Sequence, residues 1–392
     1  MKKTIVLFGI LLMSSLMMNG CSQKVSKEYL DLLEKSQTLI DENSNYIEAE
    51  ELIDQAIEMY PEAPEAYVQA GYIHLIRGEY NQANDMLSKS IEYEENFQDE
   101  DSKYFAYLNM GNLKYQQHQS ESGLEYLLKA VEINDEDPAV HNALGLVYVD
   151  MEKWEEAIEA YDKSLEIDAG YFYTYANVAS LYHKRGDYER AINEISTALA
   201  LNDQIPHFFI IKGDIEMSMD QLDTSIETFS EAIMRWSSYP DAYYKRGEAY
   251  LLQGKYLKAI NDFAYARDSG ITEAILGMGY SYQGLEQYED AIEAFALYLE
   301  SIERVDLRAM YEIGVSYYQL EDYTQAITAF DELLEFEPED TEALLIKAYA
   351  LEKSDDYETA YKILQEIIAI NSEHQAAKEE IAFIEENNLL ND

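Results

Sequence analysis

The residue types that most often carry catalysis are few or scattered in this chain. There is one cysteine, Cys21, and the six histidines lie far apart in the sequence. The sequence contains no HExxH motif, no GxSxG motif and no GxxxxGK[ST] phosphate-binding loop. Adjacent carboxylates such as Glu155-Glu156 are expected among 77 acidic residues, and surface charge explains them better than acid–base catalysis. We therefore expect a protein that is not an enzyme and that has no cofactor and no metal site.

One acid-rich segment interrupts the chain near residues 92–101. Calcium loops of the EF-hand type place oxygen ligands at alternate positions around a central glycine, and this segment has neither feature. A solvated loop is the expected state, and weak, diffuse cation binding is the alternative.

The net charge narrows the choice of partner. The chain has 77 Asp and Glu against 28 Lys and Arg, which gives a formal charge of −49. Nucleic-acid binding and adhesion to anionic lipid through a basic face both need clustered Lys and Arg, so neither is expected. A negative field instead favours neutral or basic ligands. With 47% hydrophobic residues, the chain is expected to fold around a core rather than to be disordered.

The first residues are typical of a targeting segment. Two lysines precede 15 uncharged residues, 4–18, a run shorter than the roughly 20 residues of a membrane-spanning helix. The segment ends in Gly20-Cys21, and this small residue before the cysteine resembles the lipobox of bacterial lipoproteins. Met18 and Asn19 depart from the residues most usual in that motif. An unmodified cysteine after an ordinary signal, or a short signal anchor, is the alternative.

The lipobox resemblance implies a location in the cell. Residues 1–20 would be a lipoprotein signal peptide, and residues 21–26 the lipidated N-terminus with a short tether. Two acyl chains suffice for stable anchoring where one chain is marginal. The expected location is the extracytoplasmic face of a bacterial membrane, held there by the lipid on Cys21.

A second pattern spans most of the chain. Small residues recur at steps of 32 to 40 residues, most often 34, at Gly71, Gly111, Gly145, Ala179, Gly213, Gly247, Gly279, Gly314 and Ala348. We call these nine positions the repeat marks. A second small residue follows each mark after 12 residues, and a large apolar residue follows it after 16. Nine such recurrences indicate an internal repeat.

Each repeat predicts two helices joined by a turn. Apolar residues fall at helical spacing on both sides of a position held by glycine, as at Gly186, or by an acid, as at Glu152. The small residues let two helices approach closely, and the large residue fills the remaining space. This combination resembles the tetratricopeptide repeat over residues 64–371. The resemblance implies an all-α superhelical solenoid.

The repeats predict the organisation of the chain. We expect a degenerate helical pair at residues 27–63, where Ala49, Ile53 and Ala56 keep the second-helix spacing. A tandem array of about nine repeats follows at residues 64–374, with an insertion near 92–103. A capping helix and tail would occupy residues 375–392. One continuous solenoid would replace the two or three globular domains that the length alone suggests.

Many of the 35 tyrosines fall at recurrent positions of the repeat. Tyr161 occupies the large position, and Tyr107 and Tyr175 stand four residues before a mark. We interpret these as packing residues. His141 shares the position of Tyr107 and is expected to pack in the same way rather than to bind a metal.

Other positions of the first helix line the concave surface in the tetratricopeptide repeat family. By this resemblance, the candidate groove residues are Tyr72, Asn112, Tyr115, Asn142, Tyr173, His183, Tyr244, Tyr280, Tyr311, Tyr318 and Tyr349. Tyr and Asn supply rigid apolar area together with hydrogen bonds. Ordinary solvated groove residues without a ligand are the alternative. The carboxylate clamp of chaperone-binding repeats is not supported, because Leu108 stands where the clamp has Lys, although Asn112 is present.

The preferred function is a lipid-anchored scaffold that binds protein or peptide segments, neutral or basic, at the cell envelope. The alternative is an accessory subunit of an envelope enzyme complex, or a small-molecule or cation-binding protein.

Overall fold

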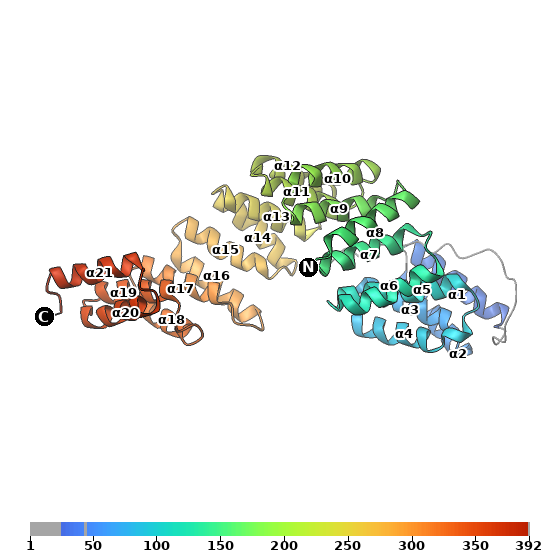
Figure 1. The fold of residues 1–392 in the computed structure, drawn as a ribbon, viewed down its shortest axis with the longest axis horizontal. Coiled ribbons are helices and arrows are strands. Elements are labelled where there is room, and N and C mark those ends of the chain that lie inside the picture. Colours follow the sequence, from blue (N-terminus) through green and yellow to red (C-terminus); the bar gives the residue numbers. More distant parts are fainter. Residues whose placement is uncertain (1–24, 43–44, 391–392) are drawn as a thin grey trace. The chain divides into compact units, whose positions relative to one another are not determined.

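The structure is a computed structural model that describes residues 25–42 and 45–390. These residues form 21 α-helices and one short 3₁₀ helix, and no strand occurs among them (Figure 1). The predicted all-α fold is therefore confirmed. Cys21, the signal segment and most of the tether lie outside the described residues. None of the described helices is both long and apolar enough to cross a bilayer.

The helices fall into two compact units, residues 1–211 and residues 212–392. In the first unit the successive pairs are α1 (Lys27–Asp41) with α2 (Tyr46–Met59), α3 (Pro64–Arg77) with α4 (Tyr80–Glu92), α5 (Glu100–Gln116) with α6 (Ser120–Ile133), α7 (Pro138–Asp150) with α8 (Trp154–Ile167), and α9 (Phe172–Lys184) with α10 (Tyr188–Leu201). Helix α11 (Pro206–Ser218) contains the boundary between the units.

The second unit continues with α12 (Leu222–Arg235). Its pairs are α13 (Pro240–Leu252) with α14 (Tyr256–Asp268), α15 (Glu273–Gly284) with α16 (Tyr288–Ser301), α17 (Leu307–Gln319) with α18 (Tyr323–Leu334), and α19 (Thr341–Lys353) with α20 (Tyr357–Ile370). Helix α21 (Gln375–Glu386) packs on α20.

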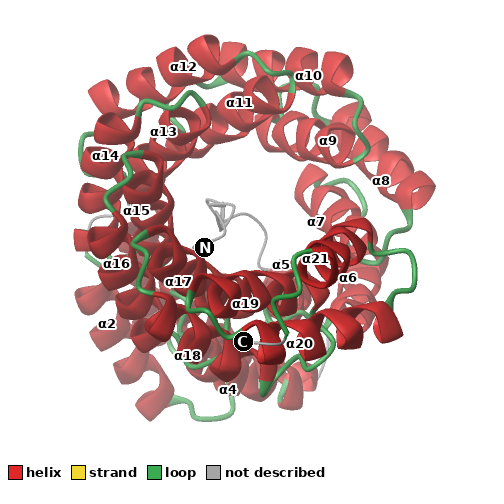
Figure 2. Ribbon diagram, turned by 90° about the vertical axis from the view of Figure 1, so that its left-hand side faces the viewer, coloured by secondary structure: helices red, strands yellow, loops and turns green. Residues whose placement is uncertain are grey.

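First and second helices form two layers within each unit. In the second unit, α13, α15 and α17 lie on one side, and α14, α16 and α18 lie on the other (Figure 2). Neighbouring first helices also touch one another, as α3 touches α5, α7 touches α9 and α13 touches α15. The first helices thus present one face that does not contact the second helices.

The marks and the large residues meet inside each pair, as the sequence predicts. A Cβ atom added to Gly145 would lie 2.3 Å from Cε1 of Tyr161, and one added to Gly279 would lie 2.4 Å from Cε1 of Phe295. Both rings are at most 1% exposed. The ring therefore occupies the space that a side chain on the mark would need, and the packing interpretation of Tyr161 is confirmed.

The two marks that are alanine show the same complementarity. Ala179 and Ala348 carry a Cβ, and their large partners are Ile195 and Leu364 rather than aromatic residues. All four side chains are fully buried. At both alanine marks the filling side chain is aliphatic, which leaves room for the added methyl group and keeps the interior close-packed.

The first helix of every repeat ends in the same turn. Its seventh residue after the mark has a positive φ, between 58° and 76°, at Gly78, His118, Glu152, Gly186, Asp220, Gly254, Glu286, Glu321 and Asp355. The next residue donates its N–H to a carbonyl five residues back, as Glu79 does to His74 at 2.9 Å. This is the Schellman ending of a helix. Glycine adopts this backbone without strain, and the six other turns tolerate a side chain there.

The N-terminal pair and the insertion have their own local support. Ala49, Ile53 and Ala56 on α2 are at most 1% exposed, as their spacing predicts. In the insertion, the 3₁₀ helix Glu94–Asn96 precedes α5, and Asp99 caps α5 by accepting the Ser102 N–H at 2.6 Å. The insertion is thus ordered by helix capping.

His141 packs as predicted. Its side chain is 8% exposed, and Nε2 lies 2.9 Å from the backbone oxygen of Asp135. Within the described residues, no three His, Cys, Asp or Glu side chains gather as a metal site would need.

Gly279→Ala should destabilise the protein by about 1–3 kcal/mol, because the new methyl group would overlap the buried Phe295 ring. Urea unfolding followed by circular dichroism measures the loss. Adding Phe295→Leu to the same chain should restore part of it, since Ala348 pairs with Leu364. The control is Gly170→Ala, where an added Cβ meets only a carboxylate oxygen of Asp168, at 3.2 Å. Equal stability of the two alanine variants would contradict the packing argument.

Candidate functional site

The candidate site is the first-helix face, which we define as the side of the mark-bearing helices that points away from the second helices. In the first unit it belongs to α3, α5, α7 and α9, with α1 of the N-terminal pair, and in the second to α13, α15, α17 and α19. All eleven candidate groove residues lie on these helices. Six belong to the first unit and five to the second.

Two of the eleven offer almost no accessible surface. Tyr72 is 4% exposed and Asn142 is 2% exposed. Oδ1 of Asn142 accepts a hydrogen bond from Nδ2 of Asn177 at 2.8 Å and from Oγ1 of Thr174 at 3.1 Å. Asn142 thus joins α7 to α9 inside the layer. The expectation that these two residues face a partner is corrected, because neighbouring helices cover them.

The nine other candidates are half-buried. In the second unit, three of their rings rest against the large aromatic residues of the second helices. The ring centroids lie 5.3 to 5.8 Å apart in the pairs Tyr244–Phe263, Tyr280–Phe295 and Tyr311–Phe330. Part of each tyrosine therefore stabilises the fold, and the rest remains accessible. Such rings are held in place before any partner arrives, which lowers the entropy lost on binding.

Carboxylates accompany these tyrosines. Burial raises the pKa of the Tyr280 and Tyr311 hydroxyls, and the nearby Glu312 and Glu342 raise it further. Both hydroxyls therefore stay neutral near pH 7 and can donate hydrogen bonds. The second-unit face thus combines aromatic area, hydroxyl donors and negative charge.

A positive charge on this face is already compensated. Nζ of Lys245 lies 3.0 Å from Oε2 of Glu248 and 3.3 Å from Oδ1 of Asp214. Burial raises the pKa of Asp214 to about 6, although Lys245 opposes the shift. The cluster leaves one carboxylate in excess.

An acidic pair, Glu352 and Glu380, lies at the C-terminal end of the second unit. Burial, together with Glu380, raises the pKa of Glu352 to about 7. Oε1 of Glu352 is buried and has no hydrogen-bond partner within the described part of the chain. Both carboxylates also raise the pKa of Tyr318 and Tyr349, after burial, so the pair lies close to two candidate tyrosines.

The first unit contains a cavity of about 280 Å³ between α1, α3 and α5. Leu30, Leu33, Val68 and Phe105 supply its apolar walls. Glu65 also lines it, although that side chain is only 7% exposed. We call this space the unit 1 cavity.

Sequence reasoning missed Glu65, although its register could have revealed it. Glu65 stands six residues before the mark Gly71, and the candidate Tyr173 stands six residues before Ala179. The two therefore hold equivalent places on their helices. An acidic residue in such an acidic chain attracts no notice until its burial is known.

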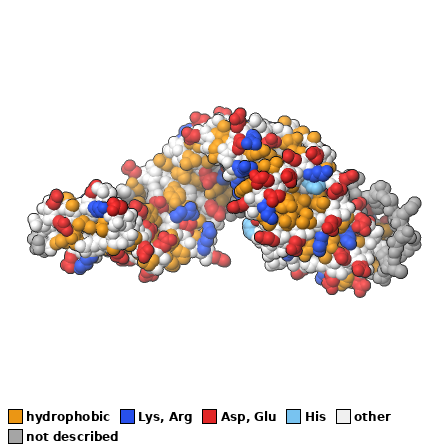
Figure 3. All heavy atoms as spheres, in the orientation of Figure 1, with side chains coloured by type: hydrophobic (Ala, Val, Ile, Leu, Met, Phe, Trp, Pro, Cys, Tyr) orange, Lys and Arg blue, Asp and Glu red, His pale blue; other side chains and the backbone are white. Residues whose placement is uncertain are grey.

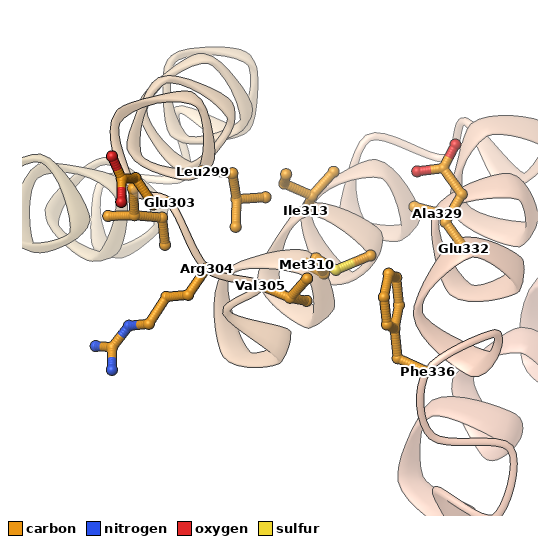
Figure 4. Close-up of a pocket in the computed structure, with 10 residues that line it drawn as sticks. Leu299, Glu303, Arg304, Val305, Met310, Ile313, Ala329, Glu332 and Phe336 are labelled. Atoms are coloured by element: carbon orange, nitrogen blue, oxygen red, sulfur yellow. The ribbon is translucent and has the colours of Figure 1, made fainter.

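A second hollow has a volume of about 400 Å³. It opens between α16, α17, α18 and the segment before α17 in the second unit. Leu299, Met310 and Phe336 border it, and Arg304 points away from it (Figure 4). Its walls are largely apolar, and Phe336 is 55% exposed.

Comparisons with known proteins agree with this geometry. Models of the tetratricopeptide repeat match residues 41–84, 136–205, 213–254, 276–336 and 311–374. This chain is built of tetratricopeptide repeats. Proteins of this kind are generally non-catalytic scaffolds.

Known relatives of this repeat protein share part of its length. The TPR repeat-containing protein MJ1428 of Methanocaldococcus jannaschii is 26% identical over 59% of this chain, and the match spans 44% of that relative's length. The structure of a tetratricopeptide repeat protein from Parabacteroides merdae superposes with a TM-score of 0.51 and 18% identity, over 65% of this chain and 99% of that chain. The APC/C hetero-tetramer Cut9–Hcn1 gives 0.56 and 18%, over 83% and 64%. These structural likenesses show a shared fold.

Glu352→Gln should stabilise the repeat protein at pH 8 and change its stability little at pH 4. An unperturbed glutamate ionises near 4.5, whereas the pKa of Glu352 in the folded state is about 7. Between these values the folded state binds more protons than the unfolded state, so stability falls as the pH rises through this window. The glutamine side chain of the variant does not ionise, so the variant does not lose stability in this way.

Thermal unfolding across pH 4 to 8 measures this effect. The exposed Glu366 on α20 provides the matched control, Glu366→Gln. The difference in Tm between the Glu352 variant and the wild type should grow with pH more than it does for the control. A difference that stays constant with pH would disprove the assignment.

Proposed function

We propose that this chain is a lipid-anchored scaffold of the bacterial cell envelope whose first-helix faces bind neutral or basic protein or peptide segments. The observation that carries the proposal is the combination of fixed, half-accessible tyrosines with carboxylates on one face. Aromatic residues held rigidly in this way are the usual anchors of protein recognition. The repeat architecture supports the same role, because stacked helix pairs create extended binding surfaces.

A protein partner is supported by one structural neighbour. Cut9–Hcn1 is described as a hetero-tetramer, so a chain of similar fold works there within an assembly. The chemistry of the face here suggests the partner's charge. Acidic side chains are spread over the visible surface with Lys and Arg scattered between them (Figure 3). Such a surface repels acidic segments and speeds encounter with basic ones.

Photo-crosslinking in cells tests the binding face. Tyr244 and Tyr318 are each replaced by p-benzoylphenylalanine, and Tyr265 on the second helix α14 serves as the matched position, since that ring is 37% exposed. Adducts from the two first-helix positions should be several-fold stronger than those from position 265. The same adducts in equal yield at all three positions would overturn the assignment of the face.

The lipid anchor is supported by the sequence around Cys21. The short apolar segment and the small residue before the cysteine resemble a lipoprotein signal, although Met18 and Asn19 depart from its usual residues. A diacylglyceryl group gives stable attachment. The first described helix starts at Lys27, so the tether has only a few residues. An anchored chain would therefore begin close to the membrane surface.

Metabolic labelling with an alkyne fatty acid in a bacterial host tests the anchor. The wild-type chain should take up label and sediment with membranes, whereas Cys21→Ser should take up none, since the thiol is the acceptor. A wild-type chain that stays unlabelled, or a serine variant labelled as strongly as the wild type, would refute lipidation at this residue.

A further inference from the structure

We propose that the unit 1 cavity binds a cationic side chain with an apolar stem, that of a lysine or an arginine from a partner protein. The inference deepens the proposed function, and it rests on that function for the identity of the partner. The site itself stands on the geometry of α1, α3 and α5.

The size of the cavity suits one side chain. Its volume of about 280 Å³ is slightly smaller than small-ligand pockets, which measure roughly 300–1,000 Å³. Leu33 and Val68 are at most 7% exposed, and Phe105 closes the wall from α5. An alkyl stem would contact these apolar side chains while its charged end meets a carboxylate that also lines the cavity.

The ionisable residues that line the cavity are all acidic. They are Glu34, Asp41, Glu65 and Asp99, and no Lys, Arg or His is among the lining residues of this described region. Glu65 is the buried member. Its Oε2 accepts a hydrogen bond from the Tyr29 hydroxyl at 3.2 Å, and its Oε1 accepts one from the Gln98 N–H at 2.7 Å.

These donors satisfy hydrogen-bonding capacity without supplying positive charge. Burial raises the pKa of Glu65, and the nearby Asp99 adds to the shift. A buried carboxylate is costly unless a cation accompanies it. An ammonium or guanidinium group next to Glu65 would provide that charge, and the Phe105 ring could add a cation–π contact.

The walls favour an organic cation over a metal ion. Calcium takes six to eight oxygen ligands. Here the lining includes leucine, valine and phenylalanine carbons, which cannot serve as ligands. The buried amides are engaged with one another, since Nε2 of Gln69 donates to Oε1 of Gln37 at 3.2 Å.

Methyl NMR of the purified mature chain tests the site directly. The probes are n-butylammonium and n-butylguanidinium, with 1-pentanol as the uncharged analogue. The cations should shift the methyl signals of Leu30, Leu33 and Val68, and pentanol at the same concentration should not. Equal shifts with pentanol, or no shifts with either cation, would overturn the proposal.

Two variants with the same change in charge separate the buried carboxylate from the general field. Glu65→Gln should weaken butylammonium binding by about tenfold or more, the usual size of a lost charged hydrogen bond. Glu58→Gln, at an exposed position of α2 outside the cavity, should leave the affinity within about twofold of the wild type, as screening predicts for a distant charge. Equal weakening by both variants would show that only the net charge matters, and the site would be withdrawn.

A second measurement keeps the proposal testable if Glu65→Gln does not fold. In the wild type, affinity should rise from methylammonium to butylammonium as the stem fills the cavity. Phe105→Ala should flatten that rise, and a flat series in the wild type would exclude a stem-binding cavity.

The result of this binding experiment is independent of the crosslinking result. Butylammonium binding without crosslinks from the first-helix face would support the cation site and refute the proposed scaffold function. Crosslinks from that face without butylammonium binding would refute the cation site alone.

Discussion

The close approach of the two helices in each pair is the constraint on which the rest of the structure depends. It requires a mark with no side chain, or only a methyl group, and a large residue that fills the space beside it. Where the mark is glycine, the filling residue can be aromatic, as Phe295 is beside Gly279. Three candidate tyrosines of the second unit then rest on such rings, as Tyr280 rests on Phe295. The contact that joins each pair therefore also positions these tyrosines on the first-helix face.

The turn between the helices serves the same contact. Its left-handed residue reverses the chain within a few positions, so the second helix can start beside the end of the first. Six of the nine turns use a residue other than glycine, at a cost of roughly 1–2 kcal/mol each. Five of those six are acidic. These turns add to the surface charge of the chain, and the packing of the pair must hold the strained backbone.

The sequence was sufficient to predict the helix pairs, the turn positions and the interior role of His141. These features depend on residue spacing within one repeat, which is visible directly in the sequence. Spacing was not sufficient to predict the burial of Asn142. Spacing indicates the side of α7 on which the residue lies, but it does not reveal which residues cover that side. The cover comes from Thr174 and Asn177, one repeat further along. Accessibility on the first-helix face is therefore a property of neighbouring repeats, and a single-repeat pattern cannot supply it.

The unit 1 cavity was missed for a related reason. It depends on the insertion, which no other repeat has. The inserted residues give α5 its 17-residue length and bring the backbone N–H of Gln98 to Glu65. A longer repeat spacing predicts an insertion, but the spacing alone does not show that the inserted residues would cover an acid on α3.

The negative charge of the chain has two physically different parts. Most carboxylates are exposed, and water and salt weaken their interactions. Burial raises the pKa of Glu65, Asp214 and Glu352, which lie on the mark-bearing helices α3, α11 and α19, and of Glu194 on the second helix α10. Such groups lower stability when ionised, and apolar residues of similar size would often pack at least as well. A cation that reaches a desolvated carboxylate recovers the free energy that its burial costs, whereas a cation at an exposed one gains little. A basic partner would therefore gain most where the first helices bury their acids, and the exposed charge would govern chiefly how fast that partner arrives.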